Sequence, residues 1–560
     1  MTRISILFII SSLLCLAVSS SSSSSSAPLD SGNRNDIFTE LDPSSYFRSS
    51  PKNILFGVTM GGSSHYSWVM RVLDELDRRG HNVTFATTDD SLRFSRQREH
   101  IKAVSVGPPQ MNDPRLDLSE MGFPMPFSVL ETMIDILGEH YPTNYHRLVD
   151  IIEKESIDAV ICDHVSYPCF DAAKKTNRPF LVSMMVNEAP ESDLPYINRN
   201  PFAMEDGNTQ RMTYSHRFYD AFIYPVKALW HLGPALWRFK QKLEALDIPV
   251  FESRWDNAVK LVNNLYGMDE PRPMGPLVEL VGPIYNDHFE SLTPEFTSFL
   301  DAHKCVVYVA FGQHSQSGDN QESTRILQML LNNYEAGVLD GFIWSATKGT
   351  PIPDHVTTAS GTLYQLDSPE FAKIGKIVSW APQTGILRHP SVVAFISHSG
   401  LMSLFEALYQ GKRILAYPLL TDQFANAKHI ERAGVALSIP LSERLNVNRM
   451  TELLGRVVED KDGSIQQAVN RYEALFQIHG RRGVDRAADI VEEVLYTADS
   501  HGRLPHRHDI ARNLSFLKRN NYDLYLGLFT LFALLAVLLY QIIKLLVLPS
   551  SSKQNKLKLQ

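Results

Sequence analysis

The chain is poor in cysteine and has no excess of basic residues. Only four of its 560 residues are Cys, and Cys15 lies in the apolar N-terminal segment. So few thiols exclude a small domain held together by disulfides. Cys162 and Cys169 could pair, but their apolar context favours two buried thiols, so we expect no disulfide framework. Lys and Arg number 54 against 62 Asp and Glu, a net charge of -8, which does not indicate a nucleic-acid partner.

The common phosphate-binding and metal-binding motifs are also missing. The turn from Gly61 to His65 is glycine-rich but lacks G-x-G-x-x-G, and the second half of the chain has no G-x-x-x-x-G-K-[ST]. The one D-x-D found in the second half, Asp460-Lys461-Asp462, precedes Gly463 and is typical of a polar helix end. The sequence therefore lacks the glycine-rich loops that would indicate a dinucleotide-binding or a P-loop protein.

The first 20 residues are interpreted as a secretory signal peptide. Arg3 precedes an apolar stretch from Ile4 to Val18, and small residues follow in a run of serines up to Ser26. A charged start, a short apolar core and a small-residue exit are the features of a cleaved signal. An uncut signal anchor is the alternative.

A transmembrane helix is predicted over residues 524–548. Tyr525 to Ile543 is almost wholly apolar, long enough to cross a bilayer, and has no polar face, which argues against a buried core helix. Basic residues flank both sides, so their distribution does not set the orientation. The signal peptide does: it predicts a single-pass type I protein with a lumenal body and a basic cytosolic tail, 549–560.

Two further features concern the predicted compartment. Lys556 and Lys558 stand five and three from the end and resemble the dilysine signal that returns proteins to the endoplasmic reticulum membrane, with a merely basic tail as the alternative. Asn82 and Asn513 begin N-x-[ST] glycosylation sequons. Asn82 borders a predicted strand, so Asn513 is the better candidate.

Between the two ends, short apolar strands alternate with helices, and the alternation occurs twice. This pattern predicts an α/β protein with two doubly wound, Rossmann-like domains, residues 50–285 and 286–498, the second closed by helices. Ligands of such sheets bind at the carboxyl ends of the strands. Polar residues stand at several predicted strand ends: His65, Asp163, His398 and the pair Asp422-Gln423.

The stretch 397–407 ends a strand and begins a helix, and it combines groups that suit a nucleotide sugar. Unpaired N–H groups at the helix start attract a phosphate, Gly400 allows close approach, and His398 adds a donor or a cation. The Glu406 carboxylate can accept from two sugar hydroxyls. Upstream, Trp380 can stack a base and Gln383 can reach a ribose.

Taken as a block, residues 380–423 resemble the donor-binding signature of the UDP-glycosyltransferases, the family of the glucuronosyl- and glucosyltransferases. The matching pieces are W-A-P-Q (380–383), H-P (389–390), H-S-G (398–400), E-A (406–407), G (411), P-L (418–419) and D-Q (422–423). The Ser64-His65 turn, Asp163 and Phe311-Gly312 match more loosely. The resemblance covers about residues 50–560 and implies the GT-B fold, in which two Rossmann-like domains face a cleft.

The resemblance also implies an inverting transfer of a hexose, glucose or glucuronic acid, from a UDP-sugar to a small lipophilic hydroxyl acceptor, without a metal or other cofactor. His65 would be the general base and Asp163 its orienting carboxylate. Residues expected to bind the UDP-sugar are Gly312, Trp380, Gln383, His398, Gly400, Ser403, Glu406, Asp422 and Gln423. The aromatic insert 213–246 could line the acceptor pocket, with ordinary helix core as the alternative. No feature predicts an oligomeric state.

Two positions depart from the family pattern. Met402 stands where an Asn near the diphosphate is usual, and Gln313 where a Ser or Thr is common. Because Met cannot donate a hydrogen bond, one phosphate contact is lost or passes to water. A catalytically silent, membrane-anchored UDP-sugar binder is therefore the second hypothesis, and a nucleotide-sugar epimerase, disfavoured by the membrane span, is the third.

Overall fold

The computed structural model describes residues 50–110, 113–116, 125–187, 189–192, 194, 196–197, 208–250, 254–255, 257–285, 289–312, 320–347, 349–420 and 422–547. The predicted signal peptide, Gln313 and the predicted cytosolic tail lie outside these residues.

Seven parallel strands form the first sheet, in the order β3-β2-β1-β4-β5-β6-β7. Their bounds are β1 (Asn53–Val58), β2 (Asn82–Thr88), β3 (Lys102–Gly107), β4 (Ala159–Asp163), β5 (Phe180–Met184), β6 (Val259–Val262) and β7 (Val278–Leu280). The central strands are apolar and buried on both sides, as expected of a parallel sheet covered by helices. The strand order changes direction between β1 and β4, which opens a crevice at their carboxyl ends.

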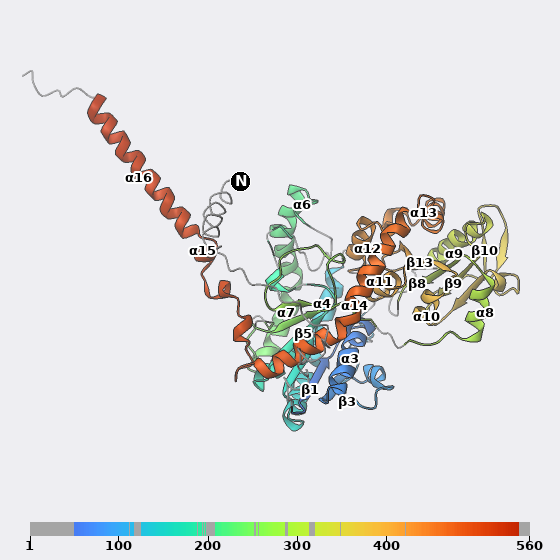
Figure 1. The fold of residues 1–560 in the computed structure, drawn as a ribbon, viewed down its shortest axis with the longest axis horizontal. Helices are drawn as coiled ribbons and strands as arrows, with labels where there is room; N and C mark the ends of the chain where they lie inside the picture. Colours follow the sequence, from blue (N-terminus) through green and yellow to red (C-terminus); the bar gives the residue numbers. More distant parts are fainter. Residues whose placement is uncertain are drawn as a thin grey trace, which may run out of the picture. The chain divides into compact units, whose positions relative to one another are not determined.

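Helices cover this sheet because each has an apolar stripe to bury. In the first helix, Val69, Val72, Leu73 and Leu76 recur at helical spacing and are fully buried. The helices are α3 (Ser63–Arg78), α4 (Phe127–Lys154), α5 (Tyr167–Lys175), α6 (Tyr214–Phe218) and α7 (Tyr224–Glu244), with a π-helical turn, η5 (Tyr219–Ile223), between the last two (Figure 1).

The second sheet has six parallel strands in the order β12-β9-β8-β13-β14-β15. Their bounds are β8 (Val306–Ala310), β9 (Gly341–Ser345), β12 (Gly375–Val378), β13 (Val392–Ser397), β14 (Arg413–Ala416) and β15 (Ala436–Ser438), and β10 (His355–Thr357) with β11 (Leu363–Gln365) makes a separate hairpin. The strand order changes direction between β8 and β13. Each sheet therefore has one switch point, and the two sheets confirm the predicted two-domain α/β architecture.

The helices of the second half are α8 (Pro294–Ala302), α9 (Asn320–Glu335), α10 (Gln383–Arg388), α11 (Leu401–Tyr409), α12 (Gln423–Arg432), α13 (Val447–Glu459) and α14 (Ser464–Thr497). Helix α14 packs against α11 and then against α3, so it joins the two halves (Figure 1). Arg79 of the first half donates to Asp489 at 2.8 Å and to Glu492 at 2.5 Å, both on α14.

Cys162 and Cys169 form a disulfide, which corrects the expectation of two buried thiols. Cys162 is in β4 and Cys169 in α5, and their Cα atoms lie 5.7 Å apart. The turn between strand and helix brings two residues seven apart face to face, a geometry that an apolar context does not reveal. Gly57 of β1 leaves room for it, since a Cβ there would lie 2.6 Å from the Cys169 sulfur.

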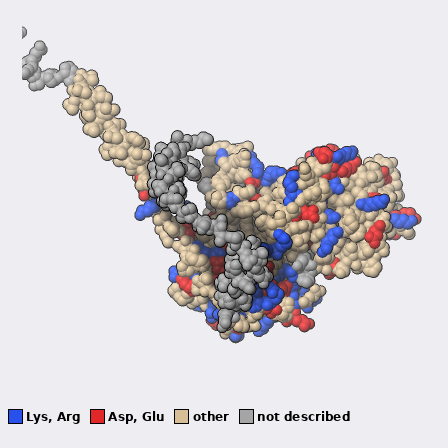
Figure 2. Space-filling model, viewed as in Figure 1, with Lys and Arg blue, Asp and Glu red and all other residues tan. Residues whose placement is uncertain are grey.

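One described helix, α16 (Tyr522–Val547), is long and apolar enough to cross a membrane. All of its described side chains are exposed, so α16 is not a helix of the protein core (Figure 2). A short basic helix, α15 (Phe516–Arg519), precedes it. These bounds agree with the span expected from the sequence.

Candidate active site

The switch point of the first sheet brings His65 and Asp163 together. Asp163 ends β4, and His65 lies in the first turn of α3, which follows the neighbouring strand β1. The His65 Nδ1 atom is 3.1 Å and 3.0 Å from the two carboxylate oxygens. Gly61, at φ +122°, makes the turn possible, because a Cβ there would lie 2.5 Å from the imidazole Cγ. The pair expected from sequence is thus in contact.

The surroundings keep Asp163 ionised. Burial by itself would raise the pKa of this carboxyl group, but the neighbouring imidazoles of His65 and His164 outweigh burial and hold the pKa below its usual range. A carboxylate at Nδ1 fixes the tautomer in which Nε2 can accept a proton. The arrangement can therefore perform general base catalysis on a hydroxyl in the cleft.

His164 is a residue of this cluster that sequence reasoning missed. Its ring stacks on that of His65, with centroids 5.2 Å apart and planes within 7° of parallel, and its Nδ1 is 3.5 Å from Asp163. The signal was its position directly after Asp163. The three side chains place ligand atoms within 4.8 Å of one another and could hold a metal ion, which would compete with His65 for the carboxylate.

The switch point of the second sheet holds the predicted phosphate end of the site. His398 follows β13 and Gly312 follows β8, and Gly400 is the residue before α11. The two glycines make room for the ring: a Cβ at position 312 would lie 2.9 Å from His398 Nε2, and one at position 400 only 2.5 Å. Gly312 also has φ +80°. Both glycines therefore leave the space that the imidazole occupies.

His398 is a neutral imidazole rather than a cation in the free protein. Burial lowers its pKa to about 4, although a hydrogen bond that the imidazole donates to the backbone of Ala310 opposes the shift. Of the two roles expected from sequence, hydrogen-bond donor or cation, the structure favours the donor. The positive end of α11 and its free N–H groups remain the main attraction for an anion here.

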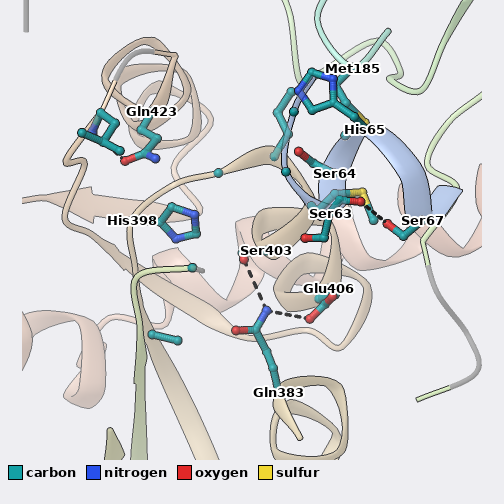
Figure 3. Close-up of a pocket in the computed structure, with 18 of the residues that line it drawn as sticks. Ser63, Ser64, His65, Ser67, Met185, Gln383, His398, Ser403, Glu406 and Gln423 are labelled. Carbon is teal, nitrogen blue, oxygen red and sulfur yellow. Dashed lines mark hydrogen bonds between the residues drawn. The ribbon is translucent and has the colours of Figure 1, made fainter. Parts of the chain in front are cut away.

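Gln383, Ser403 and Glu406 form one hydrogen-bonded group beside this helix (Figure 3). The Gln383 amide donates to Glu406 Oε2 at 2.7 Å and to Ser403 Oγ at 3.3 Å. Burial raises the pKa of Glu406 to about 7, with the Gln383 bond opposing. The carboxylate is held in place and can accept from a diol once it is deprotonated.

Trp380 and the pair Asp422-Gln423 lie at the same cavity. Trp380 is 57% exposed, and its indole nitrogen donates to Glu290 at 3.2 Å, which leaves the ring available for stacking. Gln423 is turned partly inward: its amide oxygen accepts from the backbone nitrogens of residues 419 and 420. Asp422 accepts from Asn426 at 2.9 Å.

Asn426 is a second residue that the sequence reasoning missed. Its amide also donates to the carbonyl of Ser399 at 3.0 Å. Ser399 has φ +67°, a rare conformation for a non-glycine residue. Asn426 thus connects the strained turn after β13 to the carboxylate expected to hold the sugar.

A cavity of about 960 Å³ joins both switch points. It is lined by His65 and by each predicted donor-binding residue, while Asp163 lies buried behind His65. Part of its remaining wall is apolar and rich in methionine, formed by Met60, Met125, Met133, Met185, Val186, Phe94 and Phe289, while polar residues such as Ser67, Gln97, Glu290 and Thr347 line other parts of it. Met402 also lines it and packs against the main core, with its sulfur 3.9 Å from the Asn263 amide nitrogen.

No residue of the aromatic insert 213–246 lines this cavity, so of its two alternatives, pocket lining and helix core, the first does not describe this cavity. The insert is helix core on one side only: Ala228, Leu232, Ala235 and Leu243 are buried, whereas the aromatic residues Phe218, Phe222, Trp230 and Trp237 are 46–83% exposed. The apolar wall of the cavity comes from other segments, whose scattered methionines carry no motif.

Two Rossmann-like domains with a cleft between their switch points define the GT-B fold. Solved structures agree on the fold: the glycotransferase of kitacinnamycin (17% identical, TM-score 0.57, 79% of this chain and 98% of that one) and a UDP-glucosyltransferase from Polygonum tinctorium (17%, TM-score 0.54, 79% and 99%).

Sequence comparison gives the family. Residues 198–551 match the UDP-glucoronosyl and UDP-glucosyl transferase family, and the chain belongs to it. Similar proteins include UDP-glycosyltransferase stmC of Aspergillus ustus (26% identical over 86% of this chain and 95% of that protein) and human UDP-glucuronosyltransferase 2B7 (21% over 82% and 87%). UDP-glycosyltransferase 1 of Phaeomoniella chlamydospora is 33% identical over 52% of this chain and 60% of its own length. The protein is therefore a UDP-glycosyltransferase.

Proposed function

We propose that the protein transfers a hexose, glucose or glucuronic acid, from a UDP-sugar to the hydroxyl of a small lipophilic acceptor, with inversion at the anomeric carbon. The observation that carries the proposal is the cavity itself. The His65–Asp163 pair and the glycine-lined helix start open onto the same cavity, and apolar side chains line part of its wall. Such a wall suits a sterol, a lipid or a xenobiotic alcohol better than a charged acceptor.

In the proposed reaction, His65 Nε2 accepts the proton of the acceptor hydroxyl as its oxygen attacks the anomeric carbon. Asp163 stabilises the imidazolium that forms. The bond from the anomeric carbon to the diphosphate breaks on the opposite face, and UDP takes the electron pair. The N–H groups at the start of α11 and His398 meet the charge that develops there. None of these steps requires a metal ion.

For the donor, we propose that Trp380 stacks the uracil, Gln383 and Glu406 hold the ribose, and Asp422 with Gln423 holds the hexose hydroxyls. The hydrogen-bonded group of Gln383, Ser403 and Glu406 supports the ribose assignment, because all three residues line the cavity and hydrogen bonds hold them together (Figure 3). We also propose that α16 anchors the enzyme in the endoplasmic reticulum membrane with its body in the lumen. The disulfide supports an oxidising compartment.

The experiment compares detergent-solubilised wild type with His65→Ala on a panel of UDP-sugars and lipophilic alcohols. Released UDP and glycoside mass are measured together. Glycoside from the wild type, and none or a thousandth from the variant, supports the proposal and names the donor sugar. UDP-sugar binding without turnover in either protein would contradict it and would favour the silent binder, with Met402 as the first residue to restore to Asn.

A further inference from the structure

The segment formed by α6, η5 and α7 has two apolar faces. One face packs inward: Ala228, Leu232, Ala235 and Leu243 are buried, and α7 lies along α4. Phe239 meets Tyr141 of α4 edge to face, with ring centroids 5.5 Å apart. This face accounts for the attachment of α7 to the first domain.

The second apolar face, which we call the aromatic stripe, is exposed. Tyr214, Phe218, Phe222, Val226 and Trp230 are spaced four residues apart, Leu229 lies three after Val226, and Trp237 lies seven residues, about two helical turns, after Trp230, so these residues lie toward one side of the helical segment. They are Tyr214 (75% exposed), Phe218 (46%), Phe222 (62%), Val226 (69%), Leu229 (65%), Trp230 (83%) and Trp237 (59%). Tyr214 stacks on Phe218, and Phe218 contacts Phe222, so the stripe is continuous across the π-helical turn.

The aromatic stripe is unusual for a surface in water. A surface helix normally carries polar residues opposite its buried face. Of the chain's six tryptophans, three are more than half exposed, and two of these, Trp230 and Trp237, are in the stripe. The third, Trp380, lines the catalytic cavity. A contiguous apolar surface of this length marks a contact with something apolar.

The chain itself indicates what that contact is. Arg507 donates hydrogen bonds to Glu493 and Glu279 of the folded body, and the candidate span begins at Tyr522. Residues 508–521, even fully extended, reach at most about 50 Å, so a membrane that holds α16 is always within that distance of the body. Trp and Tyr, which make up much of the stripe, are the side chains enriched at membrane interfaces.

We propose that the aromatic stripe lies in the interface of the bilayer and makes α6–α7 a second membrane contact. This inference rests on the proposed anchoring by α16. An interfacial helix buries its apolar face at the boundary of headgroups and acyl chains and does not cross the bilayer. The first domain would then be held against the lipid, where lipophilic acceptors concentrate.

The test uses the full chain reconstituted in lipid nanodiscs that contain lipids brominated near the headgroup. Bromine quenches tryptophan fluorescence on contact. We expect quenching in the wild type, loss of most of it in Trp230→Phe/Trp237→Phe, and no loss in Trp380→Phe. Trp380 is the matched control, because it is similarly exposed but lies in the other domain. The Phe substitutions keep the stripe apolar, so the variants retain the surface being probed.

Equal quenching in all three proteins would overturn the proposal. So would cross-linking of Trp230→Cys to a second copy in the nanodisc with the tryptophans unquenched, since a partner molecule would then cover the stripe. Extraction with alkaline carbonate separates the two proposals. If the protein stays with the membrane but its stripe is unquenched, the anchor stands and this inference fails. If carbonate releases the protein, the anchor itself is wrong.

Discussion

At the scale of residues, the site is a set of side chains that only the strand order brings together. His65 and Asp163 are 98 positions apart, yet they meet because β1 and β4 are neighbours. The sequence indicated both through their places after apolar strands and through the family resemblance. It did not assign a role to His164 or Asn426. The role of His164 depends on its ring stacking with His65, and that of Asn426 on its hydrogen bond to the strained turn at Ser399.

Asp163→Asn tests the orienting role of the carboxylate. An amide can present an N–H to Nδ1 and favour the wrong tautomer, so we expect kcat to fall by about 10²–10⁴ while KM for the UDP-sugar stays within a few-fold. Steady-state kinetics with the donor that the UDP-sugar panel selects measures both. Asp354→Asn, an exposed residue away from the cavity, is the control. An unchanged kcat in Asp163→Asn would remove Asp163 from the mechanism.

Glu406 predicts a pH dependence of donor binding. Because burial raises its pKa to about 7, the free enzyme loses the carboxylate acceptor as the pH falls through 7. We expect KM for the UDP-sugar to rise about tenfold between pH 8 and pH 6, with kcat measured alongside, and Glu406→Gln to remove this dependence. A KM of the variant that follows pH like the wild type would show that another group titrates.

The same shift predicts a stability effect of opposite sense. A folded pKa above the unfolded value of 4.5 means that the folded state binds the proton more tightly. The stability that Glu406 contributes is complete below about pH 4.5 and is lost as the pH rises through 7. The Tm of Glu406→Gln relative to the wild type should therefore increase from pH 5 to pH 8, as thermal melts in matched buffers would show.

Gly400→Ala tests the space around His398. The new Cβ would lie 2.5 Å from the imidazole, so the ring or the start of α11 must move. We expect a loss of about 1–3 kcal/mol in stability and a marked loss of UDP affinity, measured by thermal melts and calorimetry. Gly233→Ala, where the added Cβ meets nothing within 4 Å, is the control and should leave UDP affinity unchanged. UDP affinity retained in Gly400→Ala would show that the turn is not part of the donor site.

At the scale of elements, periodicity located the helices and strands but did not tell which side of each would be covered. The alternatives for the aromatic insert 213–246 were pocket lining and helix core; one face of α7 is core, and most of the aromatic side chains are exposed instead. Its apolar residues occur on both faces of α7, so the composition looked buried while one face is exposed. Which face of α7 is buried depends on where α4 packs, and the local sequence does not specify that position.

The disulfide between β4 and α5 is expected to stabilise the strand end that carries Asp163. Replacing both Cys162 and Cys169 by Ser should lower the free energy of unfolding by about 2–3 kcal/mol, as the closure of a short loop implies. Chemical denaturation in the absence of reductant measures this loss, and dithiothreitol should shift the wild type but not the double variant. Equal denaturation midpoints would mean that the disulfide contributes nothing.

At the scale of the whole molecule, α14 joins the two halves of the protein, and α16 is the proposed membrane anchor. Helix α14 begins against α11 of the second half and ends against α3 of the first, with Arg79 bonded to Asp489 and Glu492. Helix α16 has no buried side chains among its described residues, and its length and apolarity support the proposed anchor.

Charged residues in α16 test that anchor. Leu531→Arg with Leu535→Arg places two cations near the middle of the span, each costing about 2.5–3.5 kcal/mol in a membrane. We expect the wild type to remain in the pellet after carbonate extraction and the double variant to be released. Leu531→Val with Leu535→Val controls for the substitution itself. Retention of the Arg variant would mean that α16 is not the anchor.

The sequence alone determined the two-domain α/β plan, the family, the predicted span and most of the candidate site, because these depend on local patterns and on motif spacing. Only the tertiary structure decided the rest: that Cys162 and Cys169 pair, that His398 is neutral, that methionines form the apolar wall, and that the aromatic insert faces outward. Each of these depends on what a distant segment places beside a residue. Burial, pairing and protonation are properties of that packed neighbourhood, and no residue carries them by itself.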